Sequence, residues 1–250
     1  MSYLTDEEKQ QLTFDWRYRG FSTIQLLTEE ECEEINTELE QLRTNRFYNK
    51  DTGNEWGEYD PFMYPHKQSE KLKELLVHPK VIEAAEFLLK GDIVGLQTWA
   101  YFKPSGQLGR DMHQNIFYTE CQSNEVLNVS IALDNHDPNN GSVWYYEGTH
   151  NLGRLPIEVD EERTKSNPKN WRNERGKPCV MPEGHTFPKI DGYLRKGQVA
   201  FIHSNVVHGS EENTSNRFRK AFLCGYLKWG SNFASGNHMK REPIDVGSAK

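Results

Sequence analysis

The sequence lacks the features that mark secreted, membrane-spanning and disulfide-rich proteins. It has no apolar run approaching about 18 residues, and its first residues, MSYLTDEEKQQL, are acidic and polar, unlike a secretory signal. Its four cysteines, Cys32, Cys121, Cys179 and Cys224, are far apart and form no CxxC pair, which argues against a zinc knuckle or a disulfide framework. We therefore expect a cytoplasmic protein with no membrane contact, whose cysteines are free and mostly buried.

Clustered positive charge is also missing. The 37 acidic residues outnumber the 30 lysines and arginines, which are scattered along the chain, and the formal net charge is −7. A nucleic-acid-binding face needs concentrated basic residues, so nucleic acid is not an expected partner. The nine histidines form neither an HExxH motif nor an H-x-E motif with a CxxC pair, which disfavours hydrolytic zinc chemistry.

The first part of the chain is predicted to be mainly helical. Residues 28–43 begin with a cap-like threonine, carry acids in the first turn and place apolar residues at helical spacing. Residues 69–91 predict a second helix, broken before Pro79. We interpret residues 1–92 as helical support within one domain, 1–250, because this length suffices for a single substantial core.

From residue 93 onward the pattern changes to strands. Short β-branched or aromatic runs bounded by Gly, Asn, Pro and Asp are typical of antiparallel strands in a barrel or double sheet. We expect a mainly β, jelly-roll core over residues 93–228, with a lid-like insertion formed by the long polar segment 151–196. The predicted strands lie at 93–103, 126–134, 141–148, 198–204 and 219–227.

Two histidines far apart in the sequence indicate a metal site. His113 lies in the strand-like run RDMHQNIFY, where residues two apart share a face, so Asp111 and Asn115 would project beside it. His208 follows an apolar strand in VAFIHSNVVHGS. Two imidazoles from distant strands, with an oxygen donor two residues after the first, are the parts of a facial Fe(II) site with open coordination positions.

An arginine that follows His208 in the sequence is suited to bind 2-oxoglutarate, the cosubstrate that oxygenases with such an iron site use. Arg219 lies 11 residues after His208, on the next predicted strand, and its guanidinium matches a carboxylate. Arg217 shares the face of Arg219 by parity and is a rival for this role. The set predicts Fe(II), 2-oxoglutarate and dioxygen as cofactors.

The order and spacing of several segments resemble the phytanoyl-CoA dioxygenase family, which includes ectoine hydroxylase. The resemblance covers nearly the whole chain and implies a double-stranded β-helix fold and oxidation driven by 2-oxoglutarate. The matching pieces are RGFSTIQLLTEEECEEI, LQTWAYFKPSG, HQNIFY, VSIALDNHDPNNGSVWYYEGTH and KGQVAFIHSNVVHGSEENTSNRFRKAF.

The resemblance assigns roles to individual residues. His113 and His208 match the family's iron ligands, and Arg219 matches the arginine that binds 2-oxoglutarate. Gln97 and Trp99, on one face of the preceding strand, match positions that line the cosubstrate or substrate pocket.

Asn115 departs from the family pattern, because it stands where the family has its iron-binding aspartate. A neutral amide oxygen is a poorer donor than a carboxylate and leaves the site more positive. Four explanations are open. The aspartate was replaced to disable the enzyme; Asn115 ligates through its amide oxygen, or Asp111 takes its place; the position admits chloride, as in related halogenases; or the fold is retained without catalysis.

The expected reaction is hydroxylation of an unactivated C–H bond, with release of succinate and CO2. A small polar metabolite is the preferred substrate over an acyl-CoA, because the sequence has no cluster of basic residues that could bind the nucleotide part of coenzyme A. Tyr118, which follows the first ligand, is a candidate substrate contact, and His203 is set aside because the HGS match selects His208. Alternatives are a 2-oxoglutarate-dependent halogenase, a cupin-like enzyme that uses another metal or none, and a catalytically disabled binding protein.

Overall fold

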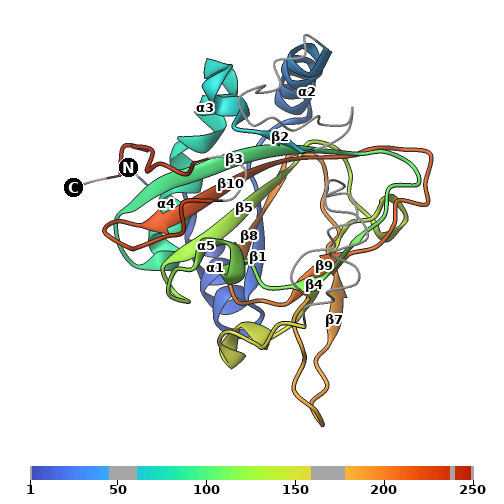
Figure 1. The fold of residues 1–250 in the computed structure, drawn as a ribbon. Helices are drawn as coiled ribbons and strands as arrows, with labels where there is room; N and C mark the ends of the chain where they lie inside the picture. The colour runs from blue at the N-terminus through green and yellow to red at the C-terminus, as the bar shows by residue number, and fades with distance from the viewer. Residues whose placement is uncertain (1, 45–60, 159–177, 237–239, 249–250) are drawn as a thin grey trace.

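Two antiparallel sheets form the body of the protein. A computed structural model describes residues 2–44, 61–158, 178–236 and 240–248. The larger sheet has the strand order β1-β8-β5-β10-β3-β2 and the smaller one β4-β9-β6-β7, which is the architecture predicted for a jelly roll (Figure 1). The strands are β1 (Phe21–Gln25), β2 (Phe62–Met63), β3 (Ile93–Lys103), β4 (Arg110–His113), β5 (Val126–Ala132), β6 (Val143–Tyr146), β7 (Lys189–Asp191), β8 (Gln198–His203), β9 (His208–Ser210) and β10 (Arg219–Lys228).

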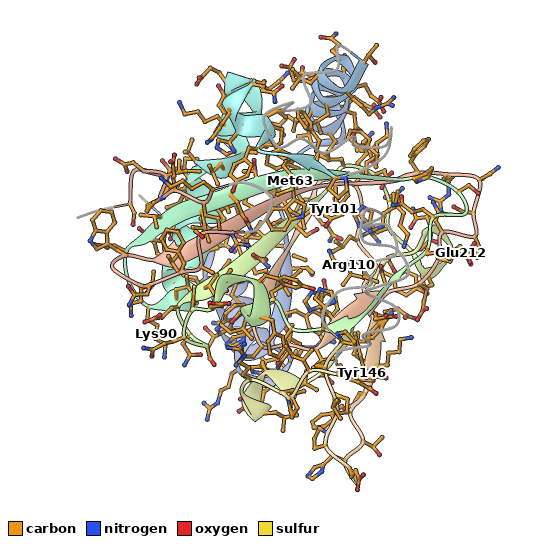
Figure 2. The ribbon with its side chains drawn as sticks, viewed as in Figure 1. Met63, Lys90, Tyr101, Arg110, Tyr146 and Glu212 are labelled. Carbon is orange, nitrogen blue, oxygen red and sulfur yellow. The ribbon has the colours of Figure 1, made fainter. Side chains whose placement is uncertain are left out.

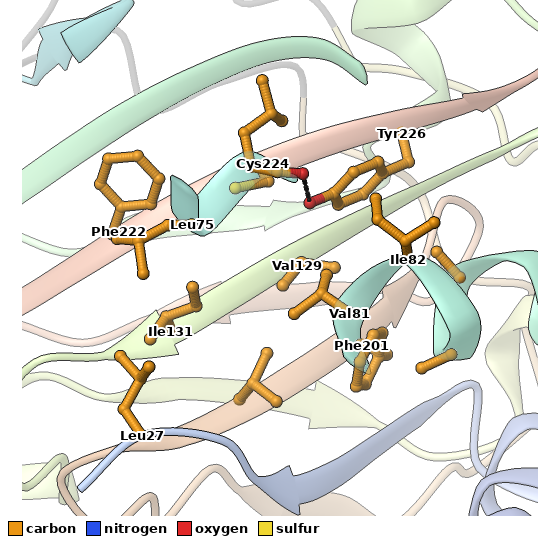
Figure 3. Close-up of a cluster of buried hydrophobic side chains, with 14 of the residues drawn as sticks. Leu27, Leu75, Val81, Ile82, Val129, Ile131, Phe201, Phe222, Cys224 and Tyr226 are labelled. Atoms are coloured by element: carbon orange, nitrogen blue, oxygen red, sulfur yellow. Dashed lines mark hydrogen bonds between the residues drawn. The ribbon is translucent and has the colours of Figure 1, made fainter. Parts of the chain in front are cut away.

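Helices cover the outer face of the larger sheet. Apolar side chains of four helices join one buried cluster with the outward-facing residues of β3, β5, β8 and β10, among them Phe102. Figure 3 shows two further members of this cluster, Phe201 and Phe222. No helix in the described part of the chain is long and apolar enough to cross a membrane. The helices are α1 (Asp6–Tyr18), α2 (Glu29–Thr44), α3 (Glu70–Leu76), α4 (Pro79–Leu89) and the short α5 (Ile116–Thr119), with 3-10 turns η2 (Pro65–Lys67), η3 (Pro138–Asn140) and η4 (Thr149–Leu152).

The opposite face of the larger sheet looks toward the smaller sheet. Ala132 and Ala200 on this face pack against Tyr145 of β6. Alternation along the strands places polar side chains on this inner face as well, since Lys103 pairs in register with Arg219. The interior between the sheets is therefore lined by alanines and cations near the start of β10, where Ala132 pairs with Ala221 and Lys103 with Arg219.

Most of the predicted elements are confirmed, including the break before Pro79 and the five strands. All four cysteines are free and buried, as expected. Residues 1–92 contain more than helices, because β1 adds to the larger sheet beside β8. Helix α1 was not predicted; Thr5 caps it in a reciprocal bond with Glu8.

The segment 151–196 is only partly described, since residues 159–177 lie outside the described residues. Its C-terminal part is not a loop, because β7 pairs with β6 in the smaller sheet. An isolated bridge also joins Ile157 to Cys179, which brings the two ends of the undescribed stretch together.

The buried hydroxyl of Tyr226 provides a test of how the larger sheet is anchored to its helices. It donates a 2.7 Å hydrogen bond to the carbonyl oxygen of Leu76 at the end of α3 (Figure 3). Tyr226→Phe should lower the free energy of unfolding by about 1–2 kcal/mol in urea titrations, because the buried carbonyl loses its donor. Tyr3→Phe, at an exposed side chain, is the control, and equal stability of the two variants would contradict this anchoring role.

Candidate functional site

The pairing of β4 with β9 brings His113 and His208 together. The two residues are directly opposite in register, and their ring centroids lie 4.3 Å apart. Both side chains are buried, with residue exposures of 5% and 6%. A Cβ atom at Gly109 would overlap the carbonyl oxygen of Ser210, and one at Gly209 would collide with the ring of Trp144. Glycine at both positions therefore permits the close approach of the strands that juxtaposes the imidazoles.

Each imidazole is held by its Nδ1 atom. Nδ1 of His113 lies 2.8 Å from the carbonyl oxygen of Asp111, and Nδ1 of His208 lies 2.9 Å from that of Val206. A carbonyl can only accept, so Nδ1 carries the hydrogen in both rings and the Nε2 lone pairs are left to bind a metal. Burial lowers the pKa of His208 to about 4 and that of His113 well below its ordinary value, and the Arg110 charge acts in the same direction. Both rings are neutral near pH 7, the form that a metal ligand requires.

Asn115 does not lie on a continuing strand, so the parity argument that placed it beside His113 is wrong. Strand β4 ends at His113, and Asn115 has helical backbone angles immediately before α5. Ile116 and Phe117 are both buried, which a strand with one solvated face does not allow. Gln114 turns inward and bonds the carbonyl oxygens of Gly153 and Asn205, fixing the turn.

No carboxylate in the described part of the chain joins the two histidines in a cluster. No group of three His, Cys, Asp or Glu side chains there could hold a metal ion, so Asp111 does not complete a site with the two histidines. Asn115 follows His113 by two residues and is partly buried, and it remains the candidate donor nearest along the chain.

Arg219 is a buried cation on the inner face of the larger sheet. Its residue exposure is 8%, and its Nε atom is buried with no hydrogen-bond partner among the described residues. Burial lowers its pKa, while Tyr101, Asp134 and Tyr145 act in the opposite direction. An orphaned guanidinium nitrogen in a buried position favours an anionic ligand.

Lys103, opposite Arg219 in register, is a second buried cation. Its ammonium group contacts the carbonyl oxygens of Gly141 and Glu211. Burial, together with the charge of Arg219, lowers the pKa of Lys103 to about 7.

The other predicted residues divide between the interior and the surface. Arg217, the rival of Arg219, lies at the surface and pairs with Asp137 at 2.5 Å, so it does not reach the interior. Trp99 lies on the inner face and is partly exposed. Gln97 lies on the same face, but its amide oxygen accepts a 2.9 Å bond from Arg241, which the sequence analysis did not single out.

Arg110 is a further site residue that sequence reasoning missed. Its guanidinium lies 3.4 Å from the hydroxyl of Tyr101 and 3.3 Å from that of Tyr118, and the Tyr118 ring in turn meets His113 edge-on with centroids 5.9 Å apart. Figure 2 shows Arg110 and Tyr101 in the space between the two sheets. In a regular strand the side chains of residues 110 and 113 would point to opposite faces. The pairing of β4 with β9 is irregular between these two residues, however, and both side chains contact Tyr118.

His203 is excluded as a ligand by its own hydrogen bonds. Its Nδ1 atom accepts from the backbone N–H of Asn205, and its Nε2 atom lies 3.3 Å from the amide oxygen of Asn124. Its ring packs against Trp16 and His150. Both nitrogens are thus used within the protein, so the choice of His208 over His203 agrees with the geometry.

Comparison with known proteins identifies the family. The sequence model described as Phytanoyl-CoA dioxygenase (PhyH) matches residues 19–221. The chain belongs to the phytanoyl-CoA dioxygenase family. Oxygenases of this family use Fe(II), 2-oxoglutarate and dioxygen, which confirms the cofactors expected for it.

The individual relatives are distant. The chain is 26% identical to rat peroxisomal phytanoyl-CoA dioxygenase over 64% of this chain and 47% of that protein. It is 25% identical to zebrafish phytanoyl-CoA dioxygenase domain-containing protein 1 over 89% of each. The chain spans about half the length of the rat and bovine phytanoyl-CoA dioxygenases that it matches (47% and 54%).

Solved structures confirm the jelly-roll fold. EctD from S. alaskensis, with 2-oxoglutarate and 5-hydroxyectoine, superposes with a TM-score of 0.73 at 16% identity, covering 98% of this chain and 88% of that one. The non-heme alpha ketoglutarate dependent carbocyclase SnoK from nogalamycin biosynthesis gives 0.71 at 18% identity and covers 97% of each chain.

The buried imidazole of His203 predicts a pH dependence of stability. Burial lowers its pKa from 6.5 to about 3. Between these values the unfolded chain binds a proton that the folded protein does not, so stability is complete above pH 6.5 and falls as the pH falls toward 3. In urea unfolding, His203→Gln should lose less stability between pH 7 and about pH 4.5 than the unaltered protein, by on the order of 2 kcal/mol. The exposed His185→Gln is the control, and equal pH slopes in all three proteins would contradict the prediction.

Proposed function

We propose that this protein is an Fe(II)- and 2-oxoglutarate-dependent oxygenase, in which His113 and His208 hold the iron and Arg219 holds the cosubstrate. The observation that carries the proposal is the opposed pair of buried imidazoles, each fixed through Nδ1 to a backbone carbonyl. Such fixed, neutral histidines are suited to a resident metal and add little to a structure without one.

The donor set fits iron with open coordination positions. Two imidazole nitrogens and one oxygen donor form a facial set, and the amide oxygen of Asn115 is the proposed third donor. Because an amide is neutral, we expect Fe(II) to bind more weakly than it would to an aspartate at this position.

The inner face of β10 fits the distal carboxylate of 2-oxoglutarate. Arg219 offers a buried, unpartnered Nε atom, and Lys103 stands opposite it. The guanidinium would orient the cosubstrate, and apolar side chains on either side of the histidines, such as Ile116 and Val207, would keep water from the reacting carbon.

The proposed reaction is hydroxylation of a C–H bond in a small polar metabolite. With iron bound, dioxygen would be the oxidant: one of its oxygen atoms would enter the substrate, and the other would enter the succinate that forms, with CO2, from 2-oxoglutarate. Polar side chains on the inner face, among them Asn128 and Ser130, support a polar substrate over a long acyl chain. Tyr118 is a proposed substrate contact, because its ring lies beside that of His113.

A second candidate function is that of a binding protein that retains the site without turnover. Asn115 favours this candidate, since no carboxylate among the described residues replaces the missing ligand. A halogenase, which would use chloride at this position, is a further alternative.

The proposed function can be tested by anaerobic titration with Fe(II) and 2-oxoglutarate. The visible charge-transfer band of the complex and oxygen-dependent succinate should appear in Asn115→Asp, with Fe(II) bound about tenfold or more tightly than by the unaltered protein. His208→Ala should abolish the band, and His203→Ala should retain it. A band and succinate in Asn115→Asp alone would support the binding-protein candidate for the chain as it stands. Absence of the band in both proteins would contradict the oxygenase assignment.

The role of Arg219 predicts a selective loss of cosubstrate affinity. Arg219→Lys should weaken 2-oxoglutarate binding about tenfold or more while Fe(II) affinity changes little, because a lysine keeps the charge but loses the planar fork. Arg217→Lys, at the surface ion pair with Asp137, is the matched control. Equal 2-oxoglutarate dissociation constants for the two variants, measured by calorimetry, would argue against this role.

A further inference from the structure

The interior between the sheets holds more positive charge than the proposed cofactors balance. Arg110 comes from β4 of the smaller sheet and Arg219 from β10 of the larger one. No carboxylate in the described part of the chain forms an ion pair with either guanidinium. A bound iron dication and a 2-oxoglutarate dianion would cancel each other, and the neutral histidines and Asn115 add no charge. The charge of Asp134 acts on Arg219, whereas only Tyr101 and Tyr118 act on Arg110 among the described residues, so the Arg110 charge would remain. Arg219 is assigned to 2-oxoglutarate, which leaves Arg110 without an anion.

The hydrogen bonds of Arg110 leave part of its guanidinium unused. One terminal nitrogen contacts the hydroxyl of Tyr101 and the other that of Tyr118, and the Nε atom is buried with no partner among the described residues. A guanidinium has five N–H donors, and the two tyrosine contacts use two of them. The edge formed by Nε and its neighbouring terminal nitrogen can therefore donate two parallel bonds to a carboxylate.

Arg110 also lies at the proposed metal site. It belongs to the same short strand as His113 and pairs in register with Ser210, two residues after His208. Tyr118 contacts both Arg110 and the ring of His113. A group bound by Arg110 would thus be anchored next to the reacting centre, on the opposite sheet from Arg219.

From this arrangement we infer that Arg110 is a specificity-determining residue, which binds a carboxylate of the substrate between Tyr101 and Tyr118. The inference rests on the proposed function and narrows its substrate class to small carboxylic acids. A carboxylate is favoured because its two oxygens match the edge of the guanidinium formed by Nε and its neighbouring terminal nitrogen. An uncharged metabolite would leave the Arg110 charge buried without a counter-ion, which costs binding free energy.

The test uses the full-length protein labelled with 15N-arginine and loaded with Zn(II), a diamagnetic substitute for iron, and saturating 2-oxoglutarate. Acetate is the probe, and acetamide is its neutral isostere. The Nε–H resonances of Arg110 and Arg219 are assigned from their loss in Arg110→Gln and Arg219→Gln. We expect 2-oxoglutarate to shift the Arg219 resonance, and acetate, added afterwards, to shift that of Arg110.

Affinity provides the second readout. Acetate binding should weaken about tenfold or more in Arg110→Gln, with the 2-oxoglutarate affinity changed less than about threefold, and acetamide should bind at least about tenfold more weakly than acetate. Arg217→Gln, at an exposed arginine, should leave acetate binding unchanged, and Arg110→Lys should show an intermediate loss.

Other outcomes separate the two proposals. If 2-oxoglutarate shifts Arg219 but acetate leaves Arg110 unmoved, or binds Arg110→Gln as well as the unaltered protein, the substrate-carboxylate assignment is wrong and the oxygenase proposal survives. If 2-oxoglutarate itself shifts Arg110 and excludes acetate, Arg110 belongs to the cosubstrate site and the assignment is also overturned. If 2-oxoglutarate shifts neither arginine, the oxygenase proposal is the one that fails.

Discussion

The backbone pairing of β4 with β9 is the constraint on which the site depends. It sets His113 opposite His208, and the glycines at positions 109 and 209 allow the strands and the Trp144 ring to approach closely. Because β4 and the turn before β9 also supply the carbonyl oxygens that fix both Nδ1 atoms, the same local structure positions the imidazoles and selects their tautomer. A metal site needs imidazoles in the right position and the right tautomer, and both therefore depend on one short, irregular strand pair.

The larger sheet contributes differently to the site. Its outer face is bound to the helices through a continuous apolar cluster, which makes it a rigid support. Its inner face carries Arg219 and Lys103, two buried cations that lack an ion pair with the described carboxylates. The smaller sheet therefore supplies the proposed metal ligands and Arg110, and the larger sheet supplies the cation proposed for 2-oxoglutarate.

Sequence patterns predicted the regular parts of this arrangement well. The strand holding Arg219 and the helix break before Pro79 follow from local composition, and the two histidines follow from the order of motifs. Residues 110–118 were read incorrectly as one strand, because the buried Gln114 ends it through contacts with distant loops. Arg110 was missed for a related reason: period-two alternation fails at an irregular register, and only the folded chain shows that it reaches Tyr101. Long-range contacts of this kind leave no local pattern in the sequence.

The most direct test of the central claim is a crystal structure of the protein grown anaerobically with Fe(II) and 2-oxoglutarate, with anomalous scattering recorded at the iron edge. The account predicts one iron peak bound by the Nε2 atoms of His113 and His208, with the distal carboxylate of 2-oxoglutarate on Arg219. Iron bound elsewhere, or 2-oxoglutarate bound away from Arg219, would contradict it.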